Sequence, residues 1–228
     1  MDFTKFVSLL HTRTLYFRRA DKLNDPFEGS YSIPTLEEIK KFIDDLHSDT
    51  RLFLNEFVKE RSDFVKKMTT CTAINCWHLN EHESVAMWNL YKTDYGVAIQ
   101  STFKRLRDCF EKTNEPIFVG TVNYIDYEHD TISGNEVLSP FLYKRKSYEH
   151  EHEVRAVLLR LPDDGGRALP STITHGVNVD VSLCVLIDNI YVAPNTEKWV
   201  VDTVQSAVDH YGCKCRVKQS RLDAKPLW

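Results

Sequence analysis

The stretch Tyr148–Arg155 constrains this chain more than any other, because glutamate alternates along it at positions 149, 151 and 153 before an apolar run begins. In a β-strand successive side chains point to opposite faces, so these three glutamates and Arg155 would share one face. Burying such a row of carboxylates is costly unless each has a partner. The pattern therefore predicts a strand whose acidic face lines a wet groove, as in an active site, or meets bulk water as an edge that resists aggregation.

The composition is that of an ordinary globular protein. The chain has 228 residues, of which 42% are hydrophobic and 27% charged, enough for one domain with an ample core. We therefore expect a single domain over residues 1–228. No apolar run approaches the roughly 20 residues that a membrane helix needs, so we expect no membrane partner. The net charge of −4 argues against broad electrostatic capture of nucleic acid, although it is compatible with a local basic groove.

The six cysteines are scattered through a chain large enough to fold without disulfides. Residues Met1–Lys5 lack the charged and then apolar pattern of a signal peptide. We therefore expect reduced thiols and a cytoplasmic location. A zinc site is disfavoured, because the cysteine and histidine spacing is not that of a common zinc finger, and we predict no metal site. Its ligands would be Cys71, Cys76, His78 and His82.

Hydrophobic periodicity predicts helices and strands in mixed order. The expected helices cover 3–10, 35–67, 83–91, 103–110 and 198–211, the second in two parts and the third capped near Asn80. The expected strands cover 14–18, 69–77, 96–101, 117–125, 153–161, 177–181, 190–193 and 215–217, with a turn at 24–30 and a loop at 162–170. A Thr-x-x-Glu capping box starts the second helix at Thr35. Because helices and strands do not alternate strictly, the class is α+β, with a largely antiparallel mixed sheet and flanking helices.

Some side chains in these elements suit a nucleotide. Arg18 and Arg19 close the first strand beside a turn, where an arginine fork binds phosphate or carboxylate, but local pairing with an acid such as Asp21 would explain them as well. Trp88 and Tyr91 share one face of a helix, where they would stack on a flat ring or join the core. The basic patch at 143–146 would neutralise phosphates or form a solvated surface.

Six segments together resemble a known family. They are Leu15–Asp21, Asp25–Gly29, Cys76–Trp77, Met87–Tyr91, Gly96–Ile99 and Lys144–Arg155. Through them the chain resembles, over essentially its whole length, the bacterial proteins grouped as domain of unknown function 2971. That label names no activity.

A second resemblance implies an activity. The order of an arginine strand, an aromatic or serine segment and a Glu-x-Glu strand is similar to that of ADP-ribosyltransferases. The resemblance implies an ADP-ribosyltransferase-like fold, NAD as the substrate, a catalytic Glu153 and Glu151 as the first acid of the pair. The middle segment differs, because it has Ser101-Thr102 and no Ser-Thr-Ser triplet.

The same resemblance divides NAD binding between the early strand and the middle segment. An arginine of the early strand would hold the dinucleotide, and an aromatic or serine residue of the middle segment would support the nicotinamide ring. The predicted nucleotide contacts are Arg18, Arg19, Phe27, Trp88, Tyr91, Ser101, Lys144 and Arg155.

Breaking the bond between nicotinamide and ribose develops an oxocarbenium ion, as in glycoside hydrolysis. A carboxylate at Glu153 that faces this cation would stabilise the transition state more than the ground state, and Glu151 would orient or deprotonate the acceptor. We therefore expect an NAD-dependent ADP-ribosyltransferase or NAD glycohydrolase, of the kind that serves as a toxin or phage-defence effector. Its acceptor is unidentified, with protein and nucleic acid both open.

Two other functions fit the same residues. A non-catalytic nucleotide-binding or antitoxin module would bind NAD without turnover. A metal-dependent nuclease would hold Mg²⁺ with carboxylates, if the acids of the early turn and of the late strand meet. Those acids are Asp25, Glu28, Glu151 and Glu153.

Overall fold

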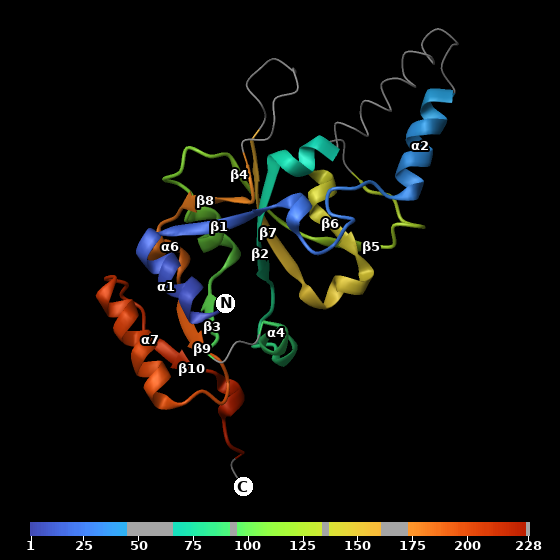
Figure 1. The fold of residues 1–228 in the computed structure, drawn as a ribbon. Coiled ribbons are helices and arrows are strands. Elements are labelled where there is room, and N and C mark those ends of the chain that lie inside the picture. Colours follow the sequence, from blue (N-terminus) through green and yellow to red (C-terminus); the bar gives the residue numbers. More distant parts are fainter. Residues whose placement is uncertain (45–65, 92–94, 134–136, 161–172, 227–228) are drawn as a thin grey trace. The chain divides into compact units, whose positions relative to one another are not determined.

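The computed structural model describes residues 1–44, 66–91, 95–133, 137–160 and 173–226. The chain divides into two compact units. Unit 1 consists of Met1–Leu15, Leu79–Glu115 and Asn178–Trp228, and unit 2 of Tyr16–His78 and Pro116–Val177. Both units combine stretches that are distant in the sequence. Helices and antiparallel strands are mixed along the chain, which confirms the α+β class (Figure 1).

The main sheet has the strand order β4-β7-β2-β1-β8. Its strands are β1 (Thr14–Arg19), β2 (Thr72–His78), β4 (Ile117–Thr121), β7 (Glu153–Leu159) and β8 (Gly176–Asp180). The long pairing of β2 with β7 is antiparallel and runs from Thr72 opposite Leu159 to His78 opposite Glu153. Strand β7 therefore has neighbours on both edges, and it carries the residues that the sequence singled out.

Strand β7 is buried on both of its faces. Every residue from Glu153 to Leu158 is buried, as expected for a strand with a continuous apolar run. On one face Val157 packs with residues from four other segments of unit 2. These are Ala20, Met68, Ile74 and Phe141. Leu158 follows Val157 in the strand, so its side chain points to the opposite face, and it is fully buried there.

The remaining elements of unit 2 lie around this sheet. A two-stranded parallel sheet joins β5 (Asn123–Ile125) to β6 (Tyr143–Arg145). The helices are α2 (Ile33–Asp44) and the 3₁₀ helices η1 (Ala20–Lys22), η2 (Ser139–Leu142) and η3 (Lys146–Glu151). A further helical stretch over 66–71 leads directly into β2.

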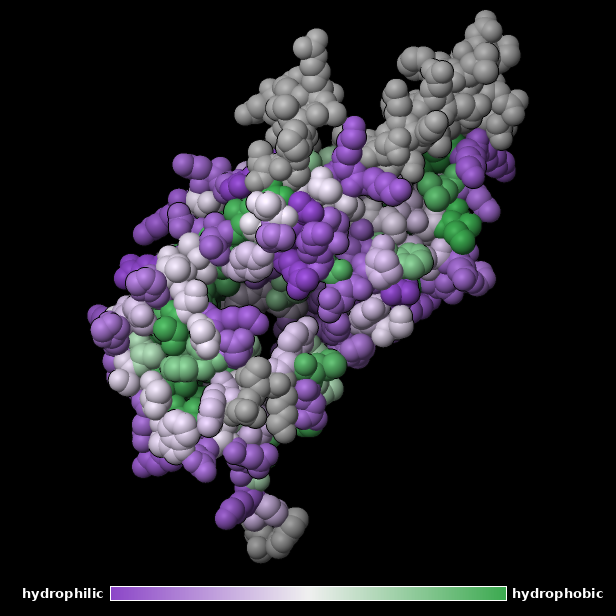
Figure 2. Space-filling view, viewed as in Figure 1, coloured by the Kyte–Doolittle hydropathy of each residue, from purple (hydrophilic) through white to green (hydrophobic). Residues whose placement is uncertain are grey.

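Unit 1 has a three-stranded sheet in the order β10-β9-β3. Its strands are β3 (Val97–Gln100), β9 (Asn189–Val192) and β10 (Val217–Gln219). Its helices are α1 (Phe3–Thr12), α4 (Val85–Leu90), α5 (Phe103–Asp108), α6 (Leu183–Leu186), α7 (Lys198–His210) and the 3₁₀ helix η4 (Arg221–Asp223). On the face drawn in Figure 2, hydrophobic residues occur in small patches between hydrophilic ones.

Most predicted elements are confirmed within a few residues, but the capping box predicted for α2 is not. The predicted capping box at Thr35 is wrong, because α2 begins at Ile33 and the first helical hydrogen bond runs from Leu36 N to Ser32 O at 3.1 Å. The Thr35 hydroxyl instead accepts a hydrogen bond from Ile132 N at 2.8 Å. Pro34 in the first turn explains the earlier start, since that position needs no backbone donor.

Other boundaries also shift. The helix predicted at 83–91 is capped by Ser84, whose hydroxyl accepts from Met87 N at 3.3 Å, and not near Asn80. The strand predicted over 117–125 is split between two sheets as β4 and β5. The loop predicted at 162–170, and the middle of the helical region predicted over 35–67, lie outside the described residues. No helix in the described stretches is long and apolar enough to span a membrane.

Candidate functional site

A fully buried arginine, Arg155, stands at the centre of a cluster of charges in unit 2. Its two terminal nitrogens donate to the two carboxylate oxygens of Glu28 at 2.7 Å each. Its Nε donates to Glu153 Oε2 at 2.6 Å, and Nη1 also donates to the carbonyl oxygen of Phe141 at 2.8 Å. A bidentate pair of this kind is the strongest form of arginine–carboxylate contact. Arg155 therefore binds two acids from different parts of the chain.

Lys144 joins two carboxyl groups at the other end of the same cluster. It is the inward-facing middle residue of β6. Its Nζ donates to Glu151 Oε2 at 2.5 Å and to Glu153 Oε1 at 2.7 Å. We call Glu28, Lys144, Glu151, Glu153 and Arg155 the ion cluster.

The ion cluster holds three carboxyl groups and two cations, so one carboxyl lacks a full counter-charge. Burial and the neighbouring Glu153 raise the pKa of Glu151 above its ordinary value. Burial would also raise the pKa of Glu153, but the carboxyl of Glu151 and the cations Arg155 and Lys144 hold that pKa far below its ordinary value. As the pH falls, Glu151 is therefore the first of these two carboxyls to take up a proton, while Glu153 stays ionised to lower pH.

The two acids meet through a change of backbone conformation and not along one strand. Helix η3 ends at Glu151, and His152 adopts a left-handed conformation with φ 39° before β7 begins at Glu153. The prediction that a strand carries the alternating glutamates is therefore wrong for residues 149–152. Glu149 is exposed on η3. The prediction that this acidic row faces a groove or bulk water is wrong for Glu153 and Arg155, which are buried with partners, and holds for the exposed Glu149.

The turn after β1 places a second set of charges against the ion cluster. Buried Asp25 accepts from Arg145 Nη2 at 2.8 Å and from the backbone nitrogen of Phe27 at 3.1 Å. The guanidinium of Arg145 lies 4.6 Å from the centroid of the Phe27 ring. The turn can close so tightly because Gly29 has φ +72°, and a Cβ there would lie 2.5 Å from the Phe141 ring.

Two residues of β2 lie opposite the ion cluster in the sheet register, His78 beside Glu153 and Cys76 beside Arg155. His78 Nδ1 lies 2.6 Å from the carbonyl oxygen of Glu151 and donates a hydrogen bond to it, while the other ring nitrogen, Nε2, is buried. Within the described parts of the chain, that buried Nε2 has no hydrogen-bond partner. Cys76 keeps an exposed surface, but the atoms packed around it and the carboxylates of Glu153 and Glu28 raise the pKa of its thiol to about 12.

The structure brings together part of the predicted site. Glu151, Glu153, Lys144 and Arg155 form most of the ion cluster, and Phe27 lies beside it through Arg145. At the centre of the basic patch 143–146, Lys144 is buried between two acids. This position is therefore neither a phosphate site nor part of a solvated surface.

The two arginines of β1 differ from each other. Arg19 Nε donates to Asp21 at 2.6 Å and its Nη1 donates to the carbonyl oxygen of Ile173 at 2.8 Å, so local pairing explains it. Arg18 is exposed and lies opposite Ile74 of β2. Strand β1 is separated from β7 by β2 alone, a spacing of about 10 Å between the outer two strands.

The residues predicted to support nicotinamide belong to unit 1, whereas the ion cluster belongs to unit 2. There Trp88 Nε1 donates to Glu83 at 3.1 Å, and Ser101 Oγ donates to the carbonyl oxygen of Leu186 at 2.6 Å. Tyr91 is 59% exposed. These contacts give Trp88 and Ser101 roles inside unit 1.

The acids proposed for a magnesium site are each paired with a cation. Asp25 binds Arg145, and Glu28 binds Arg155. In the part of the chain that the structure describes, no group of three or more histidine, cysteine or acidic side chains is arranged to hold a metal ion. The four candidate zinc ligands are therefore not assembled among those residues.

Glu28 was not predicted as the partner of Arg155; it was considered as a magnesium ligand, as a local partner of Arg18 or Arg19, and as part of the segment Asp25–Gly29. His78 was considered as a zinc ligand, and its contact with the backbone of Glu151 was not predicted. One usable signal was present, because charged residues within apolar segments are rarely buried without a counter-charge. Which acid would serve Arg155 depends on contacts between distant parts of the chain.

No protein-family model, no curated protein and no solved structure matches this chain. What the ion cluster does must therefore be inferred from its own chemistry. Two features of that chemistry matter most, the bridging ammonium of Lys144 and the opposite pKa shifts of the two glutamates that it joins.

Proposed function

We propose that the ion cluster is the active centre of an enzyme that cleaves the bond between nicotinamide and ribose in NAD and passes ADP-ribose to an acceptor or to water. The supporting observation is that Lys144 joins Glu151, whose pKa is raised, to Glu153, whose pKa is lowered. Pairs of carboxyl groups with separated pKa values divide the acid–base and charge-stabilising roles in glycosyl transfer.

Glu153 supplies a fixed negative charge. Both of its oxygens already accept a hydrogen bond from a cation, but each carboxylate oxygen can accept two, so a ribose hydroxyl can bind as well. As the bond breaks, its electron pair leaves with nicotinamide and positive charge develops on the ribose ring. A carboxylate that stays ionised stabilises that charge.

Glu151 supplies the proton transfer. Its side chain is 17% exposed, whereas that of Glu153 is 7% exposed, so Glu151 is the more accessible acid. A carboxylate with a raised pKa is a better base than an ordinary one. As the acceptor oxygen bonds to the ribose carbon, Glu151 takes the acceptor's proton.

Residues near the cluster suit the rest of the dinucleotide. Phe27 is 38% exposed and presents a ring beside Arg145, where it can stack on nicotinamide. Arg18 lies two strand spacings across and four residues along from Glu153, a Cα separation of roughly 16 Å. An extended dinucleotide can span this distance. With the nicotinamide ribose at Glu153, the pyrophosphate would bind Arg18.

The test is release of nicotinamide from NAD, measured by chromatography with and without cell lysate as a source of acceptors. We expect Glu151→Gln and Glu153→Gln each to lower the rate by about 100-fold or more. Glu149→Gln is the matched control, because Glu149 is an exposed acid on the same 3₁₀ helix and should leave the rate unchanged. A folded wild-type protein that releases no nicotinamide under either condition would overturn the proposal.

A non-catalytic nucleotide-binding module is the second candidate. It is favoured by the burial of Glu153 and by the pairing of both its oxygens with cations, an arrangement that also suits a purely structural acid. Calorimetry separates the two functions. Binding of NAD without nicotinamide release, unchanged in Glu151→Gln, would favour the module.

A further inference from the structure

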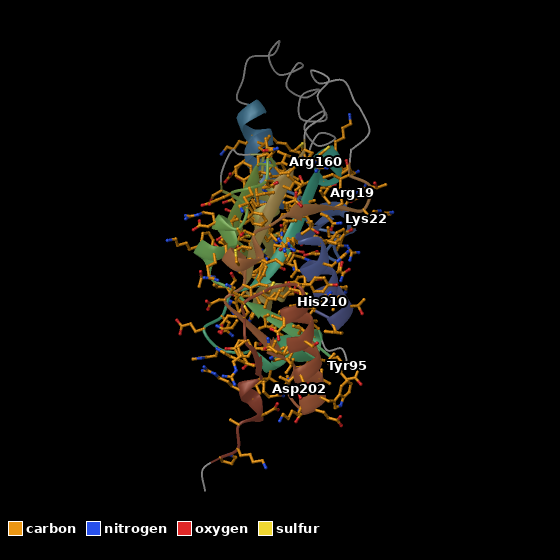
Figure 3. The ribbon with its side chains drawn as sticks, turned by 90° about the vertical axis from the view of Figure 1, so that its left-hand side faces the viewer. Arg19, Lys22, Tyr95, Arg160, Asp202 and His210 are labelled. Atoms are coloured by element: carbon orange, nitrogen blue, oxygen red, sulfur yellow. The ribbon has the colours of Figure 1, made fainter. Side chains whose placement is uncertain are left out.

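Basic side chains from three separate stretches of the sequence gather at one end of the main sheet in unit 2. Strand β1 and η1 contribute the first three, the helical stretch before β2 contributes two lysines, and the residue after β7 contributes the last. We call them the basic end: Arg18, Arg19, Lys22, Lys66, Lys67 and Arg160. Figure 3 shows three of them, Arg19, Lys22 and Arg160, at the same end of the ribbon.

The strand pairing explains why these stretches meet. Because β1 and β2 are antiparallel, the end of β1 adjoins the beginning of β2, with Arg19 opposite Ala73. Strands β2 and β7 are antiparallel as well, so the end of β7 adjoins the same place. The backbone nitrogen of Arg160 there donates to the carbonyl oxygen of Cys71 at 3.0 Å.

The charge of this end is opposite to that of the whole chain. The described stretches 16–23, 66–74 and 157–160 contain six basic residues and one acid, Asp21. Asp21 pairs closely with Arg19 at 2.6 Å and loosely with Lys22 at 3.9 Å. The side chains of Arg18, Lys22, Lys66 and Lys67 are exposed. A chain with net charge −4 thus concentrates positive charge in one place, which is the electrostatic pattern of a polyanion site.

An aromatic ring lies next to these charges. Tyr16 precedes Arg18 by two residues on β1, so the two side chains share a face, and Tyr16 is 50% exposed. A Cβ at Gly176 of β8 would lie 2.5 Å from the Tyr16 ring, so the ring rests directly against that strand. An exposed ring beside a row of cations is the combination that binds single-stranded nucleic acid, with bases stacked on the ring and phosphates on the cations.

We propose that the basic end of unit 2 binds a single strand of nucleic acid, with phosphates on its lysines and arginines and a base stacked on Tyr16. Lys66, Lys67 and Arg160 lie toward the end of β7 opposite Glu153, whereas Tyr16 lies farther along the sheet, level with Cys76 and Arg155. This site goes beyond the proposed function: it shares Arg18 with the proposed NAD site, but it does not use Glu151 or Glu153, so binding should be retained in Glu151→Gln. If three to five phosphates are neutralised, log Kobs should fall against log salt concentration with a slope of about −2 to −3.5.

The test is fluorescence anisotropy with labelled oligodeoxythymidylate, oligouridylate and a duplex of mixed sequence, titrated at several salt concentrations. The triple variant Lys22→Gln, Lys66→Gln, Lys67→Gln should make the salt slope shallower by about 2. The matched control replaces Lys5, Lys104 and Lys112, exposed lysines of unit 1, by glutamine and has the same net charge. It should keep the wild-type slope.

Tyr16→Leu separates stacking from charge, since leucine keeps an apolar side chain against Gly176. We expect it to weaken binding of single strands by about tenfold or more with no change in salt slope. The two single-strand probes distinguish RNA from DNA as the ligand. Absence of binding at low salt, an equal loss in both triple variants, preference for the duplex, or binding of vesicles with anionic lipid in place of nucleic acid would each overturn the proposal.

Discussion

Arg155 donates to both carboxylate oxygens of Glu28 at 2.7 Å, although 127 residues separate the two in the chain. The contact joins the turn that follows β1 to the third residue of β7. Because Arg155 also binds Glu153, the charges that hold this turn in place are the same charges that form the candidate site.

Arg155→Gln should destabilise the protein by about 3–5 kcal/mol, because it leaves Glu28 and Glu153 buried without their counter-charge. The free energy of unfolding, measured with urea, checks this. Arg18→Gln is the control, since Arg18 is exposed, and it should cost no more than about 0.5 kcal/mol. Equal stability of the two variants would show that Arg155 is not buried between these acids.

Stability should decline as the pH falls below about 4.5, the ordinary pKa of a glutamate. The pKa of Glu153 is lowered in the folded state, so its stabilising charge is present above the unfolded pKa and is lost as the pH falls toward the folded one. The pKa of Glu151 is raised, so protonation there opposes the loss. In urea titrations the decline should be shallower for Glu153→Gln and steeper for Glu151→Gln. Parallel curves for all three proteins would contradict both shifts.

The conformation of Gly29 should be indispensable for the turn that carries Glu28. Gly29→Ala introduces a Cβ at φ +72° and 2.5 Å from the Phe141 ring. Gly212→Ala is the matched control, because Gly212 has φ +71° with nothing within 4 Å of the added Cβ. We expect thermal and urea unfolding to show about 1–2 kcal/mol lost in the control, and a further 1–3 kcal/mol in Gly29→Ala. Equal losses of stability in Gly29→Ala and Gly212→Ala would show that the Phe141 ring does not lie against Gly29.

Two exposed cysteines should differ in reactivity. The hydroxyl of Ser182, 3.2 Å from Cys184 Sγ, lowers the pKa of the Cys184 thiol, whereas the pKa of the Cys76 thiol is raised to about 12. Iodoacetamide at neutral pH, followed by peptide mass spectrometry, should alkylate Cys184 about 30-fold faster or more. Cys184→Ser removes the fast site and serves as the control. Faster alkylation of Cys76 would contradict this order.

The parts of the fold that local patterns determine were predictable. Helix α7 and the apolar part of β7 follow from periodicity and from a continuous hydrophobic run. The beginning of β7 at Glu153 agrees with the strand predicted over 153–161, but the alternation over 149–153 also favoured an earlier start, and the structure has a 3₁₀ helix there. The observed turn depends on the left-handed conformation of His152, which histidine adopts more readily than most residues but which is uncommon for any residue other than glycine.

The candidate site was predictable in its local residues and not in its distant partner. The glutamates stand out because they adjoin an apolar run, and Lys144 and Arg155 are near them in the sequence, whereas the pairing of Arg155 with Glu28 joins residues 127 positions apart. Trp88 and Ser101 were grouped with these acids by their order in the sequence, and such an order carries no information on which compact unit a residue joins.

The junction at His152 also separates two time scales of motion. Glu153 begins a strand that is paired on both edges and buried on both faces, so its neighbours should exchange their amide hydrogens only when the whole unit unfolds. Glu151 ends a 3₁₀ helix with no buried residue, which should open far more often. We therefore expect the two carboxyl groups bound to Lys144 to differ in mobility, with Glu151 moving away and returning while Glu153 stays in place.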